Sequence, residues 1–227
     1  GAFFFIEIAK RTHILDSLAN LIREISDDKM VQGVLVTFPL EFMIEGSSGF
    51  GTPLLMVAPL LRALGFPLIL CATLPFICLI SAIPYGALGT PIRLGFHIAN
   101  DDIHHLSYST SYVVLLFVYI APMITALLIQ HFDPKPRPLK KITAWIFMIA
   151  TVYAFFNHWV SKLGPEFPAL ASSFFTFLII ILTRGWFFKK KPIRSIRGMK
   201  IYGALLLVFW IGKQIWLDEK IPGTPLR

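Results

Sequence analysis

Charged residues are scarce in this chain of 227 residues. Lys, Arg, Asp and Glu make up 15% of it, whereas they make up about 25% of an ordinary soluble domain. Hydrophobic residues reach 56%, and the mean hydropathy is +0.69. These values exclude an ordinary soluble globular domain and indicate an integral membrane protein.

Cysteine is also scarce, since Cys71 and Cys78 are the 2 cysteines of the chain. Both lie on one apolar segment, and a helix would separate them by roughly 10 Å along its axis. That separation is too large for a disulfide bond. We therefore expect two free, buried thiols that pack as small apolar side chains.

The chain lacks the sequence patterns of catalytic and metal centres. It contains no H-E-x-x-H and no G-x-S-x-G, which argues against a membrane-embedded enzyme, and no cofactor is expected. His104 and His105 are adjacent, so on a helix their side chains would point about 100° apart. We expect a surface loop there rather than a metal site.

Long hydrophobic runs are what the chain does have. The core of a bilayer needs about 20 helical residues to cross it. Residues 13–29 instead carry Ile and Leu on one helical stripe and charge elsewhere, as is typical of an interfacial amphipathic helix. The predicted fold is an all-α, polytopic transmembrane helix bundle. Its full spans are expected at Pro67–Ala87, Tyr108–His131, Ile142–Val160, Ala169–Phe188 and Ile201–Trp216.

Basic residues gather in two connectors, residues 133–141 and residues 184–200. Both should face the cytoplasm, because loops rich in Lys and Arg do so. The connectors at Asn100–His105 and Ser161–Phe167 then lie on the opposite side. The net charge of +8 thus follows from topology. Anionic lipid headgroups are the expected partner of the basic loops, and nucleic acid is not, since no aromatic stacking platform accompanies the charges.

A break in the first half of the chain is the strongest functional signal. The segment EGSSGFGTP, residues 45–53, places a carboxylate and three glycines between two apolar runs. Glycine loosens a helix, and Pro53 suits the first turn of a new one, so Glu45–Pro53 is predicted to be nonhelical. Residues Pro53–Gly65 are too few to span and are predicted to form a half-helix. Broken backbone at membrane depth is tolerated only inside protein or beside water, and a carboxylate there indicates a functional site.

A second break follows in PYGALGTP, residues 84–91, and it repeats the Gly-Thr-Pro triplet of the first. Helix starts attract anions through unpaired amides, so the two breaks could converge on one anionic ligand. Alternatively, the glycines only permit close helix packing. The nearby Glu45 and Ser47–Ser48 favour a binding site for the first break. The candidate binding residues are Ser47, Ser48, Gly49, Gly51, Thr52, Gly89 and Thr90.

At these residues the chain resembles the bacterial L-lactate permease family, whose pattern includes F-L-E-G-[AS]-[AS]-G-F-G-[AT]-P. Here it stands as FMIEGSSGFGTP, followed by LLMVAPLLRALGF. The resemblance extends to GAFFFIEIAKRT at the start, to GALGTP in the second break, and to LGPEFPALASS at residues 163–173. It covers most of the chain. Two departures stand out: Glu41 occupies a position where a small residue is usual, and the tract before the second break lacks the usual Asn-Thr pair.

The resemblance implies a secondary transporter in the bacterial inner membrane. Its substrate would be L-lactate, or a related 2-hydroxy monocarboxylate such as glycolate or D-lactate, taken up together with a proton. Family members are about twice as long, with roughly a dozen spans. Residues 1–227 are therefore expected to form a single transmembrane domain, part of the N-terminal half, which would need the remaining half as partner. The start at Gly1 inside an apolar run also suggests truncation.

Glu45 is predicted to carry the coupled proton, because burial among apolar side chains favours a neutral carboxyl. The rival prediction is structural: a charged carboxylate that caps the amides of the break, or pairs with Arg62. For the whole chain the alternative to a carrier is a nontransporting membrane scaffold or an inert truncated fragment. A scaffold would have no need of a buried carboxylate at a helix break.

Overall fold

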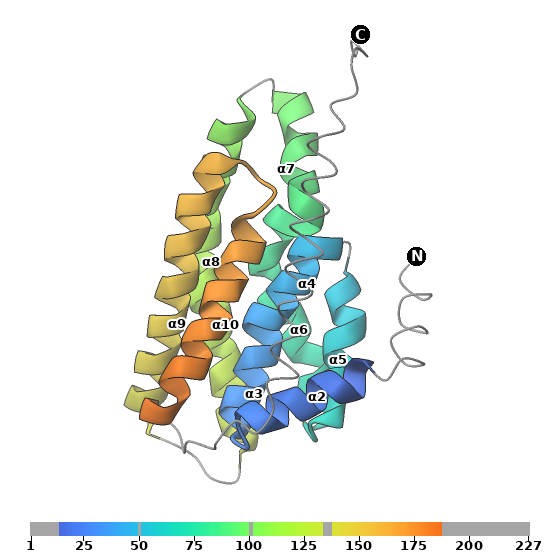
Figure 1. The fold of residues 1–227 in the computed structure, drawn as a ribbon, viewed down its shortest axis with the longest axis vertical. Coiled ribbons are helices and arrows are strands. Elements are labelled where there is room, and N and C mark those ends of the chain that lie inside the picture. The colour runs from blue at the N-terminus through green and yellow to red at the C-terminus, as the bar shows by residue number, and fades with distance from the viewer. Residues whose placement is uncertain (1–13, 50, 100–101, 134–137, 188–227) are drawn as a thin grey trace. The chain divides into compact units, whose positions relative to one another are not determined.

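The computed structural model describes residues 14–49, 51–99, 102–133 and 138–187. Within these ranges the chain consists of helices and short connectors without a strand, which confirms the all-α fold class (Figure 1). The predicted span at residues 201–216, the apolar run at the start of the chain and the basic residues 188–200 lie outside the described residues.

The described helices form one continuous succession with few connecting residues. Their bounds are α2 Ile14–Ile25, α3 Lys29–Leu35, the π-helix η1 Val36–Leu40, α4 Glu41–Ser48, α5 Thr52–Ala63, α6 Leu68–Ala82, the 3₁₀ helix η2 Ile83–Tyr85, α7 Gly86–Ala99, α8 Ile103–Phe132, α9 Leu139–Val160, the 3₁₀ helix η3 Ser161–Leu163 and α10 Pro168–Phe187.

Three helical stretches of the described residues are long and apolar enough to cross a membrane: Leu68–Phe96, Ile103–Phe132 and Leu139–Leu163. A shorter apolar stretch, Pro168–Thr183, forms most of α10. These stretches agree with four of the predicted spans in position. The predicted end of the first span at Ala87 is wrong, because α6 stops at Ala82 and passes through η2 into the second break.

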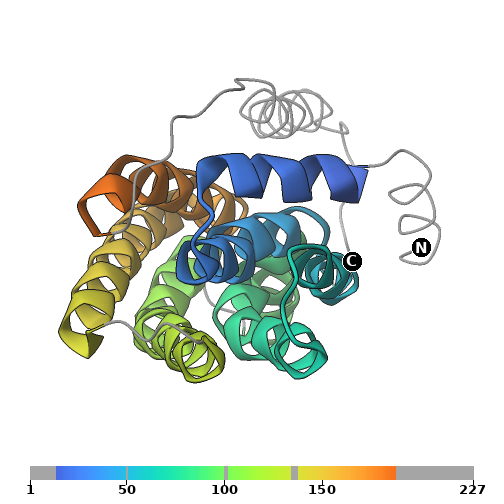
Figure 2. The same ribbon diagram turned by 90° about the horizontal axis from the view of Figure 1, so that it is seen from below.

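The predicted amphipathic helix is α2. It buries Leu18, Leu21 and Ile22 and exposes Asp16 and Arg23, which is the division that the sequence pattern indicates. α2 runs crosswise to the steep helices α8, α9 and α10 in Figure 1, and Figure 2 shows its length from below. Its position in a membrane interface stays a prediction.

The segment from α3 to α4 is a single helical path with a local irregularity. Pro39 lies inside η1 and has no amide hydrogen to donate, so the regular bonding pattern cannot continue through it. The Glu41 amide then donates to the carbonyl of Val36, five residues earlier. Such π-type turns rotate the residues that follow, and they occur frequently at functional sites.

The connectors on the α7–α8 side and between α9 and α10 come together at one end. A Cβ placed on Gly164 would lie 3.8 Å from Cε1 of His104. The sequence predicted only that these two connectors lie on the same side of the membrane, and that side stays a prediction. It was wrong about His104 and His105 themselves, which lie in the first turn of α8 because the Asp102 side chain accepts hydrogen bonds from both of their amides.

Candidate functional site

The first break is shorter than predicted. α4 continues through Ser48 and α5 begins at Thr52, so the predicted nonhelical segment Glu45–Pro53 is wrong at both ends. Gly49 has φ +60° and Gly51 has φ +76°, and these left-handed residues are enough to end one helix and start another. Pro53 lies in the first turn of α5, and that helix is a piece of 12 residues, as predicted.

The second break is a run of left-handed backbone at the start of α7. Ala87, Leu88 and Gly89 have φ of 45°, 56° and 76°. Positive φ is unfavourable for residues with a side chain, so the surrounding structure must hold Ala87 and Leu88 in place. The Thr90 hydroxyl bonds to the carbonyl of Ala87 at 2.6 Å and closes this turn.

The two breaks meet directly. A Cβ on Gly49 would lie 2.6 Å from Cβ of Ala87 and 2.8 Å from its backbone nitrogen. No side chain fits between the two backbones at this point. The two helix interruptions are thus in backbone contact, and their convergence on one anionic ligand, which the sequence suggested from the repeated triplet, stays a prediction.

Glu45 lies between the breaks. The backbone amide of Gly51 in the first break is a hydrogen-bond donor within electrostatic reach of its carboxylate. A Cβ on Gly86, at the second break, would lie 2.5 Å from Oε1 of Glu45. The side chain is 3% exposed, and its Oε2 atom has no hydrogen-bond partner among the described residues. One carboxylate thus lies next to both helix interruptions, and one of its oxygens has no hydrogen-bond donor.

The predicted binding hydroxyls have other partners in this structure. Ser47 and Ser48 donate to the carbonyl of Ile44 at 2.7 and 2.8 Å, which is the usual bonding of a helical serine. The backbone amides of Gly49 and Thr52 bond to the carbonyls of Glu45 and Gly49 at 2.8 and 3.1 Å. An incoming anion must therefore exchange with bonds that already exist.

The connector between α9 and α10 packs against the second break. In the sequence, this segment was notable only through the family resemblance of residues 163–173. A Cβ on Gly89 would lie 2.5 Å from both Cβ and the carbonyl oxygen of Pro165. Arg93 on α7 forms an ion pair with Glu166, next along the chain from that proline. Arg93 thus contacts a carboxylate 73 residues away in the chain. Local sequence cannot indicate such a tertiary contact.

Two further buried features escaped sequence reasoning. Tyr85 is fully buried just before the second break and donates to the carbonyl of Ser107 at 2.7 Å. Glu41, one turn before Glu45, is 0% exposed. For Glu41 it is the complete burial that sequence reasoning missed, since the sequence already marks this residue as unusual for its position and as a carboxyl one turn before Glu45 that could take its role. Cys71 and Cys78 are free and buried, as predicted.

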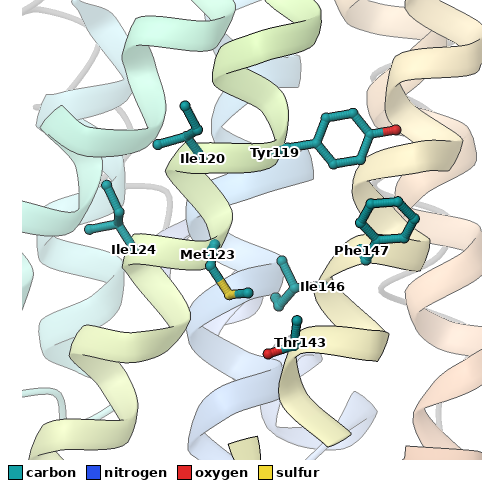
Figure 3. Close-up of a pocket in the computed structure, with 7 residues that line it drawn as sticks. All are labelled: Tyr119, Ile120, Met123, Ile124, Thr143, Ile146 and Phe147. Carbon is teal, nitrogen blue, oxygen red and sulfur yellow. The ribbon is translucent and has the colours of Figure 1, made fainter. Parts of the chain in front are cut away.

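An apolar groove between α8 and α9 is a poor match for a carboxylate. Figure 3 shows its lining, which includes Ile120, Ile124 and Phe147, and its volume is about 330 Å³. The three side chains are also exposed on the outside of the described helices. An exposed apolar surface on membrane-spanning helices suits lipid chains or another helix, so the breaks remain the candidate site.

Comparison with known proteins agrees with the motif. The sequence model of the family described as L-lactate permease matches residues 1–204. The L-lactate permease of Escherichia coli (strain K12) is 27% identical over 199 residues, 87% of this chain and 35% of that protein. The L-lactate permease of Bacillus subtilis (strain 168) is 24% identical over 192 residues, 84% of this chain and 33% of that protein.

A glycolate permease of Escherichia coli (strain K12) is 22% identical over 184 residues, 80% of this chain and 32% of that protein. No solved structure is significantly similar to the chain. The chain spans about a third of the length of the curated relatives it matches. With the family pattern matched over nearly its whole length, the chain belongs to the L-lactate permease family.

Proposed function

We propose that this chain forms the anion-binding and proton-binding part of a secondary transporter in the bacterial inner membrane. The substrate is a short 2-hydroxy monocarboxylate of the lactate or glycolate class, imported with a proton. Relatives named for lactate and for glycolate support this substrate class. Because the chain spans about a third of those relatives, the carrier needs further membrane-spanning segments as its partner.

The observation that carries the proposal is the position of the Glu45 carboxylate beside the Gly51 amide. An ionised Glu45 occupies the donor that a substrate carboxylate would use at this helix start. Protonation makes Glu45 neutral and weakens its hold on the amide, so the substrate anion can replace it. Proton and anion then bind together, and the neutral pair suits a crossing through a low-dielectric site.

The substrate would contact both breaks. Amides of the Gly49–Pro53 stretch and the hydroxyl of Thr52 would receive its carboxylate, with Ser47 and Ser48 turning from the Ile44 carbonyl toward its 2-hydroxyl. Gly89 and Thr90 would line the opposite side. Helix interruptions that present backbone groups to a ligand are a recurrent design of transporters.

The structural alternative assigns Glu45 to capping alone, in a scaffold or an inert fragment. Its position beside the Gly51 amide fits that alternative as well. This alternative does not include an ion pair between Glu45 and Arg62, because Arg62 donates to the carbonyl of Phe66 at 3.4 Å. The unpartnered Oε2 of Glu45 favours the transport role, since a buried acceptor without a donor has a free-energy cost and no capping use.

The test is Glu45→Gln in the complete transporter, reconstituted into proteoliposomes. Uptake of radiolabelled lactate driven by a pH gradient should be lost, while exchange of internal for external lactate should continue, because the glutamine amide resembles the neutral acid. Glu24→Gln, on α2, is the matched control and should retain both activities. Unimpaired gradient-driven uptake in the Glu45 variant would exclude Glu45 as the coupling residue. Loss of folding or of all binding would favour the capping role.

A further inference from the structure

Glu41 is a fully buried carboxyl to which no role has been assigned so far. Its side chain is 0% exposed, and neither Oε1 nor Oε2 has a hydrogen-bond partner among the described residues. An ionised carboxylate in such a place would lack both water and donors, and this is the most unfavourable situation for a charge in a protein.

Among the described residues, the groups around Glu41 do not supply a compensating positive charge. Glu45, one turn further on α4, is the charged group that acts on it. The Cys78 thiol of α6 is within electrostatic reach. The cations of the neighbouring helices are engaged elsewhere, with Arg62 of α5 on the Phe66 carbonyl and Arg93 of α7 on Glu166. Tyr85 of η2 bonds to the Ser107 carbonyl, and the buried Tyr153 hydroxyl of α9 has no hydrogen-bond partner among the described residues.

Glu41 and Glu45 are held close by their spacing. Residues four apart on a helix have Cβ atoms about 5–6 Å from each other on one face. Two buried carboxyl groups at such a separation do not both ionise, because like charges disfavour the charged form in each other. Both residues lie within α4, so the helix itself sets their four-residue spacing.

Further buried polar side chains lie near Glu41, between the helices. The Cys78 sulfur lies 3.2 Å from Oγ1 of Thr125, and the Thr37 side chain is within electrostatic reach of the same thiol. Thr37 is itself satisfied by the Gly33 carbonyl at 2.9 Å. Glu41 therefore stands between a carboxyl at the helix break and a buried polar cluster on η1, α6 and α8.

We propose that Glu41 is a second proton-binding carboxyl of the transport site, a neutral acid that exchanges its proton with Glu45. In the transfer, the O–H bond of Glu41 breaks, an O–H bond forms on the Glu45 carboxylate, and the negative charge moves to Glu41. A proton from the aqueous side then restores the neutral Glu41. The proposal rests on the proposed function for its meaning in transport, but the protonation of Glu41 is testable without a substrate.

The first experiment is infrared difference spectroscopy on the purified complete transporter at neutral pH without substrate. The wild type should show the carbonyl band of a protonated carboxylic acid, shifted in D₂O. The band should disappear in Glu41→Gln and persist in Glu45→Gln. Absence of the band in the wild type, or its persistence in Glu41→Gln, would overturn the proposal. The wild-type spectrum tests the proposal by itself. The protonation of Glu41 therefore stays testable even if one of the variants does not fold.

The second experiment measures transport in proteoliposomes. Glu41→Gln should lose lactate uptake driven by a pH gradient and retain lactate exchange, while Glu41→Asp, which keeps an acid, should recover part of the gradient-driven uptake. Full uptake in Glu41→Gln would overturn the relay. So would wild-type uptake that requires sodium, since Glu41 would then serve as a cation ligand. If the wild type moves no 2-hydroxy acid at all, the proposed function fails while the infrared result still decides the protonation of Glu41.

Discussion

Gly86 is the residue that most directly controls the position of Glu45. An added Cβ would lie 2.5 Å from Oε1, the far end of a flexible side chain, and the Gly86 φ of −65° is open to alanine. Gly86→Ala should therefore displace the carboxylate from the Gly51 amide without unfolding the protein. We expect lactate affinity to become less dependent on pH, as measured by binding to the purified transporter between acidic and alkaline pH.

The control for this substitution is Gly95→Ala on α7. There the added Cβ would meet Cδ2 of Leu106 at 3.6 Å, which is ordinary van der Waals contact. Its pH dependence should match that of the wild type. A Gly86→Ala protein with an unchanged affinity profile would contradict competition between Glu45 and the substrate for the break.

Sequence alone could identify Glu45, Gly49 and Gly51, because a carboxylate and left-handed residues have local signatures in an apolar run. It could not identify Gly86 as the neighbour of Glu45, since that contact joins two separate breaks. The hydroxyl predictions show the opposite difficulty. Ser47 and Ser48 have the right chemistry for a ligand, but in the last turn of α4 they bond to a carbonyl of their own helix.

At the scale of the helix, the left-handed start of α7 should be intolerant of side chains at Gly89. Its φ is +76°, and a Cβ would meet the backbone oxygen of Pro165 at 2.5 Å. Strained backbone of this kind costs on the order of 1–3 kcal/mol, and the clash with a rigid proline adds to it. Gly89→Ala should lower the midpoint of thermal unfolding in detergent, whereas Gly95→Ala should leave it nearly unchanged. Equal midpoints would show that the connector moves freely away from the break.

The elements themselves were largely predictable, but their ends were not. Apolar length indicated α8, α9 and α10, and Pro53 indicated the start of α5. Glycine composition made Glu45–Ser48 look nonhelical, yet Gly46 serves close packing, since its Cβ would lie 3.0 Å from Cβ of Ala169 on α10. Local propensity cannot distinguish a glycine that breaks a helix from one that admits a neighbouring helix.

At the scale of the described helices together, Arg93 and Glu166 join α7 to the connector before α10. The side chains are 36% and 23% exposed, so water screens the pair in part. A coupling energy of about 0.2–1 kcal/mol is expected for such a pair. Arg93→Glu and Glu166→Arg should each lower thermal stability, because each places like charges together, and the double variant should recover most of the loss.

The same charge-swapped double variant tests whether the connector before α10 must stay closed over the second break during transport. Gly89 and Pro165 hold the backbones together without charge, so the double variant should keep lactate exchange close to that of the wild type. Each single variant should reduce exchange in proportion to its loss of stability. If the double variant regained stability but not lactate exchange, Arg93 would have a direct part in binding the substrate anion, because the charge swap moves both charged groups and only the guanidinium attracts an anion.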